Sequence, residues 1–78
     1  MTTTKTIDQD TLQTLVETGS LRELRTVREG DGWALQGRLG TSWLPVRSRR
    51  EAVRVWRSLT AVERFCVAAG VKQLLVEL

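Results

Sequence analysis

The sequence contains no histidine and no tyrosine, and it has a single cysteine, Cys66. Histidine is the commonest general base, metal ligand and pH switch in proteins, so its absence argues against most acid–base and metal chemistry. One cysteine excludes a disulfide within the chain and a zinc site built from cysteine and histidine. Any serine, threonine or cysteine nucleophile would also lack a histidine to activate it. We therefore expect a protein that is not an enzyme and that uses no cofactor or metal.

Long apolar runs are missing as well. No stretch approaches the ~20 consecutive apolar residues that span a bilayer, and residues 1–10 are too polar for a secretory signal. An unpaired cysteine is consistent with a reducing compartment. These features predict a cytoplasmic protein with no membrane partner.

The composition is that of one small globular domain. The chain has 78 residues, of which 41% are hydrophobic and 27% charged, and this size leaves room for a single core. We assign residues 1–6 to a flexible tail, because they have little to bury. Residues 7–78 are expected to form a single domain.

The first helix is predicted over residues 9–18. Asp8 is suited to cap its start, because its side chain can accept a backbone N–H group of the first turn. Leu12, Leu15 and Val16 follow at helical spacing. Gly19 then ends the pattern, as a residue with left-handed backbone does.

The second helix is predicted to start at Thr60, since Thr60 and Glu63 have the spacing of a capping box, and to end at Gly70. One face of this helix is apolar and is expected to point inward: Val62, Phe65, Cys66 and Ala69. Cys66 should therefore be a small buried side chain, since a reactive thiol needs exposure and an electropositive setting.

Strands are predicted where apolar and polar residues alternate or turn signals intervene. Gly30-Asp31-Gly32 indicates a turn between two strands of a hairpin, and Gly40-Thr41-Ser42 indicates a second turn. The predicted strands cover residues 21–29, 33–39, 43–46, 52–57 and 71–78. The fold class is then α+β: a short helix, an antiparallel meander of about four strands, a second helix and a C-terminal strand, with the helices on one face of the sheet.

Residues 48–58 allow two interpretations. As a helix they place Ala52, Val53, Trp56 and Leu59 at one-turn spacing, and as a strand they alternate apolar and charged side chains. We favour the strand over residues 52–57, because the capping box starts a helix at Thr60.

The net charge is +3, and the basic excess is concentrated in residues 38–57, where six arginines accompany one acid, Glu51. Such a cluster is typical of a surface that contacts nucleic-acid phosphates. It is equally suited to an acidic protein partner, and it could also be a solvated face that keeps a small sheet soluble.

Three tryptophans, Trp33, Trp43 and Trp56, are most simply core residues in so small a domain. Trp43 is our candidate for an exposed one, able to stack on a base or to anchor a protein interface. Trp56 is expected in the core. The candidate DNA- or partner-binding residues are Arg38, Trp43, Arg47, Arg49, Arg50, Arg54 and Arg57.

The last predicted strand is apolar on both sides. A homodimer formed by strand pairing, or by burying a second face, would explain this pattern. A central strand covered by both helices would explain it equally well.

Several stretches together resemble the ParC family of small partition-associated proteins of bacterial plasmids and integrative elements, which are unrelated to the topoisomerase subunit of that name. The stretches span residues 6–78, and the most distinctive are Gly32-Trp33-Ala34-Leu35 and Val53-Arg54-Val55-Trp56-Arg57, followed by Leu59-Thr60 and a close of Ala69-Gly70-Val71. The sequence departs from the family pattern at residues 37–50 and at its last four residues. The resemblance implies an accessory role beside a ParA-type ATPase and a ParB-type DNA-binding protein, and it supplies no catalytic motif.

The resulting hypothesis is a non-enzymatic accessory protein of a mobile genetic element. It would bind DNA, or a partition complex on DNA, through its arginine-rich surface. The alternative is a protein-interaction module that inhibits or modulates a larger partner, such as an ATPase, a toxin or a host defence complex.

Overall fold

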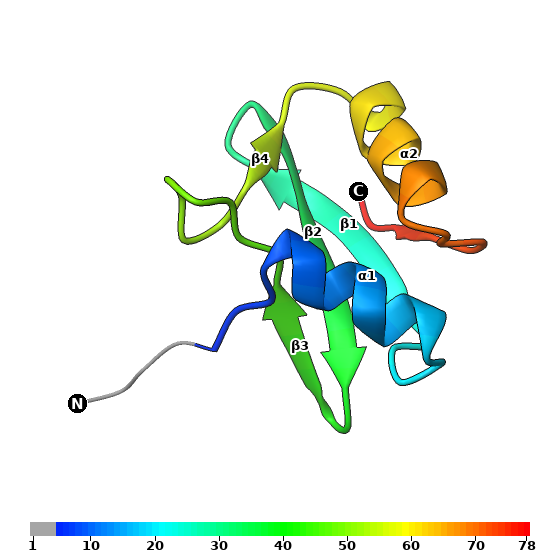
Figure 1. The fold of residues 1–78 in the computed structure, drawn as a ribbon. Helices are drawn as coiled ribbons and strands as arrows, with labels where there is room; N and C mark the ends of the chain where they lie inside the picture. Colours follow the sequence, from blue (N-terminus) through cyan, green and yellow to red (C-terminus); the bar gives the residue numbers. More distant parts are fainter. Residues whose placement is uncertain (1–4) are drawn as a thin grey trace.

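Two helices and five strands follow one another in the computed structural model, which describes residues 5–78 (Figure 1). They confirm the predicted α+β class. Of the predicted tail, residues 1–4 lie outside the described part of the chain. In order the elements are α1 (Gln9–Glu17), β1 (Leu24–Glu29), β2 (Gly32–Leu39), β3 (Ser42–Pro45), β4 (Val55–Trp56), α2 (Leu59–Ala68) and β5 (Leu75–Val76).

Helix α1 begins and ends as its sequence predicts. An oxygen of the Asp8 side chain accepts a hydrogen bond from the Thr11 N–H group at 2.8 Å. Gly19 follows the helix with a φ of 74°, a left-handed conformation that glycine adopts without strain.

Helix α2 begins earlier than predicted. Ser58 is its N-cap, with extended backbone and a side-chain oxygen that accepts from the Ala61 N–H group at 3.2 Å. Thr60 already lies inside the first turn, so the predicted capping box is wrong. A serine two residues upstream satisfies the free N–H groups of the first turn, and this leaves Thr60 no capping role.

Strands β1 and β2 form the predicted hairpin, in antiparallel register from Leu24 opposite Gly37 to Glu29 opposite Gly32. Gly30 has a φ of 58° at the turn. Strand β3 then pairs antiparallel with the second half of β2, from Gln36 opposite Pro45 onward. The first three strands are therefore a meander.

The fourth strand corrects the prediction of a four-strand meander. Strand β4 pairs with β2, placing Trp56 opposite Trp33 and Val55 opposite Ala34, and it lies on the same side of β2 as β3. This is possible because β2 has eight residues whereas β3 has four and β4 only two. Both short strands fit along one edge of β2, end to end.

Residues 47–54 form a loop that leaves the edge of β2 and returns to it. The Arg54 N–H group donates to the Val46 carbonyl at 2.9 Å and closes the neck of this loop. The strand interpretation of residues 52–57 is thus confirmed over the helix, but only for Val55 and Trp56.

The fifth strand is short and runs parallel to β1, with Arg25 opposite Leu75 and Thr26 opposite Val76. The strand order is β3-β2-β1-β5, so the sheet is mixed. Of the predicted strand over residues 71–78, only Leu75 and Val76 pair. The C-terminal strand is an edge strand, and the alternative of a central strand covered by both helices is wrong.

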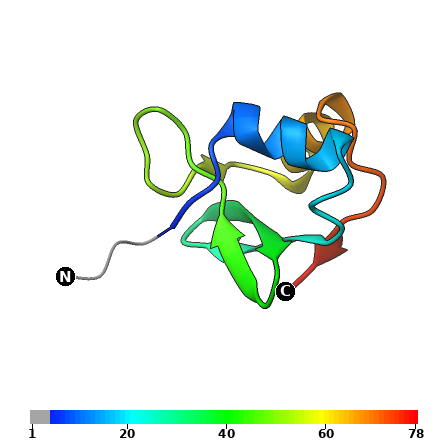
Figure 2. The same cartoon turned by 60° about the horizontal axis from the view of Figure 1, so that its bottom comes forward.

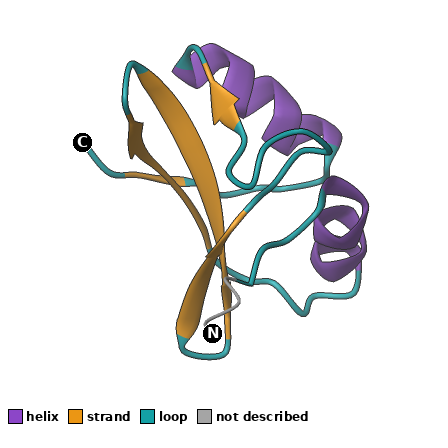
Figure 3. Ribbon diagram, turned by 90° about the vertical axis from the view of Figure 1, so that its left-hand side faces the viewer, coloured by secondary structure: helices purple, strands orange, loops and turns teal. Residues whose placement is uncertain are grey.

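Both helices cover the same face of the sheet, as the views of Figures 2 and 3 show. The core lies between these two layers. Trp33 and Trp56 are 6% and 5% exposed, and Cys66 is 3% exposed. The predicted burial of Trp56 and of the Cys66 thiol is confirmed. The other core side chains are Ile7, Leu12, Leu21, Leu24, Leu35, Val46 and Val62.

The chain from Ile7 onward belongs to this fold. Ile7 is buried and forms a parallel bridge with Val46; its N–H group donates to the Pro45 carbonyl, and its own carbonyl accepts from Arg47, each at 2.9 Å. The segment that precedes α1 therefore covers the outer edge of β3 at its C-terminal end. Within residues 5–78 neither helix has the length and apolar character needed to cross a membrane.

Candidate partner-binding surface

The arginines of residues 38–57 do not form one cluster in space. Arg47, Arg49 and Arg50 lie on the loop between β3 and β4, whereas Arg38 lies on β2. All three are exposed. Ser48 and Glu51 shape this loop, since the Glu51 N–H group donates to the Ser48 hydroxyl at 3.0 Å.

The loop faces the first turn of α1 across an open cleft. The lining combines two acids with two bases: Asp8, Gln9, Asp10, Thr11, Arg47, Ser48 and Arg49. The hydrogen bonds from Thr11 hold the pKa of the Asp8 carboxyl below its usual value, and nearby Arg47 adds to the effect. The cleft therefore has mixed charge, which weakens the attraction that a purely basic surface would exert on phosphate.

Arg54 is bound to the fold. Its guanidinium lies 4.5 Å above the ring of Trp56 and 5.3 Å from that of Phe65, and it donates a hydrogen bond to the Gln9 side chain. These contacts tie the returning end of the loop to α1 and α2, so Arg54 is a structural residue. Arg57 lies at the other end of β4, in a shallow pocket with the acids Glu29 and Asp31.

No helix covers one face of the sheet, which we call the open face (Figure 3). Trp43 lies on this face, because it is opposite Arg38, three residues along β2 from the core-facing Leu35, and side chains of a strand alternate between faces. It is partly exposed, whereas the other two tryptophans are buried. Across the β2–β3 ladder Trp43 is directly opposite Arg38. Of the predicted site residues, Arg38 and Trp43 are the pair that the sheet brings together on this face.

A third residue, Arg25 on β1, completes this group. Its guanidinium lies 4.2 Å above the ring of Trp43, and its Nε–H group donates to the Gln36 side-chain oxygen at 2.7 Å. We call Arg25, Gln36, Arg38 and Trp43 the Trp43 cluster. A guanidinium stacked on the indole ring favours this orientation of the ring.

Two ion pairs balance the charge of the Trp43 cluster. Arg25 pairs with Glu77 at 3.3 Å, and Arg38 pairs with Glu23 at 3.2 Å. Exposed pairs of this kind contribute little to stability. They do offset the two positive charges beside Trp43, so the Trp43 cluster together with Glu23 and Glu77 has no net charge.

The sequence analysis missed Arg25. It lies in residues 21–29, where the apolar period is unclear, and it is distant in sequence from Trp43. The available signal is alternation: Arg25 is one residue from Leu24 and Thr26, which face the core, so its side chain must face the other way. Pairing that strand with β2 then places Arg25 beside Gln36.

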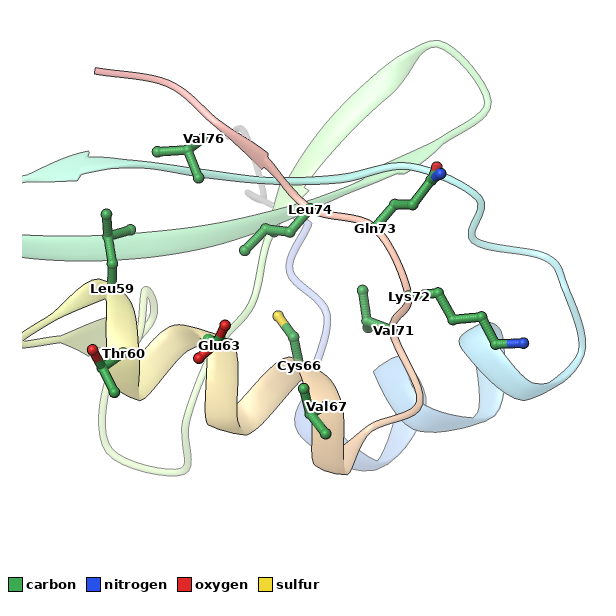
Figure 4. A pocket seen from close by; sticks show the side chains of 10 residues that line it. All are labelled: Leu59, Thr60, Glu63, Cys66, Val67, Val71, Lys72, Gln73, Leu74 and Val76. Atoms are coloured by element: carbon green, nitrogen blue, oxygen red, sulfur yellow. The ribbon is translucent and has the colours of Figure 1, made fainter.

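A second hollow, of about 430 Å³, is the groove between α2 and β5 (Figure 4). Leu59 and Val67 of α2 and Val76 of β5 line it and are 36%, 69% and 41% exposed. Cys66 lies at its base with the sulfur pointing toward Leu74 (Figure 4). Burial raises the pKa of the Cys66 thiol to about 11, so the sulfur is a neutral packing group at neutral pH.

No group of three or more histidine, cysteine or acidic side chains within residues 5–78 is placed to hold a metal ion. Comparison of the chain with protein-family models, with curated proteins and with solved structures found no match. The resemblance to the ParC proteins stays a prediction from the sequence motifs. The surface chemistry of the chain is therefore the basis for inferring its function.

Proposed function

We propose that this protein is a non-enzymatic interaction module that binds another protein through the Trp43 cluster on the open face. The observation that carries the proposal is the stacking of the one partly exposed tryptophan under Arg25 and beside Arg38. Tryptophan and arginine are the residues most enriched among those that dominate the energy of protein interfaces. A ring whose bound orientation is already favoured in the free protein loses less entropy on binding.

The charge around Trp43 favours a protein over nucleic acid as the partner. Phosphate binding needs an excess of positive charge, and here Glu23 and Glu77 each pair with one arginine of the cluster. Protein interfaces commonly combine an aromatic centre with charged pairs at the rim. A partner carboxylate could exchange with Glu23 or Glu77, which favours a partner with acidic side chains around an apolar pocket.

The resemblance to the ParC proteins suggests the setting. In that setting the protein is an accessory factor of a plasmid or integrative element, and the partner is a ParA-type ATPase or a ParB-type DNA-binding protein. An inhibitor of a toxin or of a host defence complex would use the same surface.

Direct DNA binding is the second candidate function, and one observation favours it. Arg47, Arg49 and Arg50 are exposed on the loop before β4, and none of them forms an ion pair within residues 5–78. Three arginines on one loop can contact a phosphate backbone without reading its sequence. Such binding would be weak and would fall as salt rises.

Affinity capture with three baits tests the proposal: the wild type, Trp43→Ala, and Arg64→Ala as a control on the exposed side of α2. We expect nuclease-treated extract to yield a partner with the wild type and the control but not with Trp43→Ala. The purified partner should bind Trp43→Ala roughly 30-fold more weakly, the loss typical of a central interface tryptophan. Circular dichroism checks that each bait is folded.

The opposite pattern would refute the proposal. If wild type and Trp43→Ala capture the same proteins with equal affinity, the Trp43 cluster is not the binding surface. Fluorescence anisotropy with a labelled duplex at low and near-physiological salt tests the second candidate in parallel. Binding that falls steeply with salt, and that is lost in Arg49→Ala/Arg50→Ala, would establish DNA as the ligand.

A further inference from the structure

Exposed apolar side chains gather at one end of the molecule. Among the described residues, all the large exposed ones except Val55 belong to α2 or to the segment of β5: Leu59, Val67, Leu75, Val76 and Leu78. Leu59, Val67 and Val76 line the groove between α2 and β5 (Figure 4), and Leu75 is the other residue of β5, the strand that forms this sheet edge. An apolar patch at an open strand edge is typical of a protein interface.

The two edge strands of the sheet, β3 and β5, differ in how far the rest of the chain covers them. At the β3 edge, Ile7 pairs with the backbone of Pro45 and Arg47, and Pro45 itself has no N–H group to offer. At the β5 edge the described chain has no covering segment, no proline and no unpaired charge in the strand, since Glu77 is held by Arg25. The β3 edge is covered at its C-terminal end, whereas no segment of the described chain covers the β5 edge.

The hydrogen bonds of β5 define which of its groups are free. The Glu77 N–H group donates to the Thr26 carbonyl of β1 at 2.9 Å. Backbone groups of a strand alternate in direction, so the N–H and carbonyl groups of Val76 and Leu74 point away from β1. These two residues are the ones able to pair with another strand.

We propose that β5 pairs antiparallel with β5 of a second copy of this chain, with Leu75 opposite Leu75 of the partner on the two-fold axis. In this register Leu74 lies opposite Val76 of the partner, so the free backbone groups of both residues meet. Gln73 lies opposite Glu77 of the partner, which pairs an amide with a carboxylate. No like charges are opposed, as a stable cross-strand register requires.

The neighbouring registers are less well matched. Moving the axis to Val76 places Leu75 opposite the Glu77 carboxylate, and moving it to Leu74 places Leu75 opposite the Gln73 amide and Val76 opposite the Lys72 ammonium. Each shift sets an apolar side chain against a polar one within residues 73–77, whereas the register centred on Leu75 does so only at its ends, where Lys72 lies opposite Leu78 of the partner. The matching of apolar with apolar and of amide with carboxylate in one register is what favours a second copy over an unrelated peptide.

The dimer would be one continuous sheet. A two-fold axis perpendicular to the sheet keeps both sets of helices on one side and both open faces on the other. Leu75 shares a shallow pocket with Trp43, so the two Trp43 clusters would flank the axis on the same face. The dimer does not depend on the proposed function, and failure of either leaves the other standing.

Sedimentation equilibrium over a wide range of protein concentration tests the proposal. We expect a monomer–dimer equilibrium for the wild type. In Leu75→Lys, which places two positive charges face to face on the axis, dimerisation should be at least about tenfold weaker. Val55→Lys, which introduces the same charge at an exposed apolar position on β4, should dimerise like the wild type.

A backbone variant separates edge pairing from apolar contact. Because Cys66 is the only cysteine, residues 66–78 can be joined to residues 1–65 by native chemical ligation, with an N-methyl group on Val76. This group removes an N–H donor that points away from β1, so the fold should be retained and the dimer lost. Unmodified ligated protein is the control.

Three results would overturn the proposal. One is a wild type that stays monomeric at every concentration, including the case in which it binds an extended peptide at β5 instead. Another is a dimer that survives both Leu75→Lys and N-methylation of Val76. The third is a dimer that is lost in Val67→Lys but kept after N-methylation, which would assign the contact to the face of α2.

Discussion

Replacing Gly32 by alanine would place a methyl group where β2 meets β4. A Cβ atom at this position would lie 2.5 Å from the carbonyl oxygen of Trp56 and 2.5 Å from a methyl carbon of Val55. The Val55 side chain is 38% exposed and can rotate away, but the Trp56 oxygen is a backbone atom of a residue packed in the core and 5% exposed. The substitution therefore has to push β4 away from β2.

The size of the effect follows from these distances. Contacts of a Cβ atom below about 3 Å do not occur in relaxed structures, so β4 must shift by at least a few tenths of an ångström, which disturbs the two pairs that join it to β2. Overpacking of a well-packed site costs ~1–3 kcal/mol, and a collision with backbone belongs at the upper end of that range. In a domain of this size a loss of ~2–3 kcal/mol lowers Tm by roughly 10–20 °C.

Gly37→Ala is the matched comparison. There the new Cβ atom would meet side-chain methyl carbons of Leu21 at 2.9 and 3.0 Å and of Ile7 at 3.2 Å, with no backbone atom among its nearest neighbours. Side-chain tips rotate more easily than a strand moves, so we expect a loss of ~1 kcal/mol. Neither glycine has a positive φ, so backbone strain does not enter the comparison.

Thermal unfolding followed by circular dichroism, with urea titrations at room temperature, measures both variants. The expected order of stability is wild type, Gly37→Ala and then Gly32→Ala. A Gly32→Ala protein that melts within about 2 °C of the wild type would refute the assignment of β4 to the edge of β2. A Gly37→Ala protein less stable than Gly32→Ala would contradict the ranking of backbone over side-chain collisions.

Other predictions concern single side chains. Ser58→Ala should lower the free energy of unfolding by about 1 kcal/mol, because it removes the cap of α2. Thr60→Ala should change this free energy little. Equal losses for the two variants in urea titrations would argue against Ser58 as the cap. Because the pKa of Asp8 is lowered by folding, its contribution is present above the ordinary value of 3.8 and is lost as pH falls through the lowered value. In Asp8→Asn the acid limb of a Tm-against-pH curve should flatten, and an unchanged limb would contradict this reasoning. The Cys66 thiol is buried, and its pKa is raised to about 11. At neutral pH it should therefore react with a disulfide reagent far more slowly in the folded protein than in the urea-unfolded protein. Similar rates would show that α2 opens readily.

Local signals in the sequence predicted the elements of this fold well. The capping aspartate before α1 and the glycines at 19, 30 and 40 act within a few residues of themselves, and each lies where the structure needs it. The exception is the start of α2, where two candidate caps, Ser58 and Thr60, stand two residues apart. A spacing rule alone could not choose between them.

Pairings between distant strands could not be predicted. Periodicity indicates which side chains of a strand face the core, but it carries no information on which strand lies beside it. Strand β4 pairs with β2 because β3 is too short to occupy the whole edge of β2. Strand β5 pairs with β1, although the two strands lie near opposite ends of the sequence. Both facts follow from tertiary packing.

The same limit applies to the candidate site. The loop over residues 47–54 carries four of the arginines. Three of them are exposed, whereas Arg54 stacks on the rings of Trp56 and Phe65. Trp43 was correctly distinguished from Trp56 by its place beside a turn. Its neighbour Arg25 could be recognised only after β1 had been paired with β2.

The parallel pairing of β1 with β5 also sets the order in which the sheet can form. Strands β1, β2 and β3 are joined by tight turns and can assemble from local contacts, whereas Arg25 and Glu77, which hold β5 to β1, are 52 residues apart. Contacts between such distant residues form late, since a long loop has to close first. Until then the second edge of β1, including Thr26, is open to any chain nearby. We therefore expect the yield of refolding to fall as protein concentration rises, even though the finished fold covers that edge.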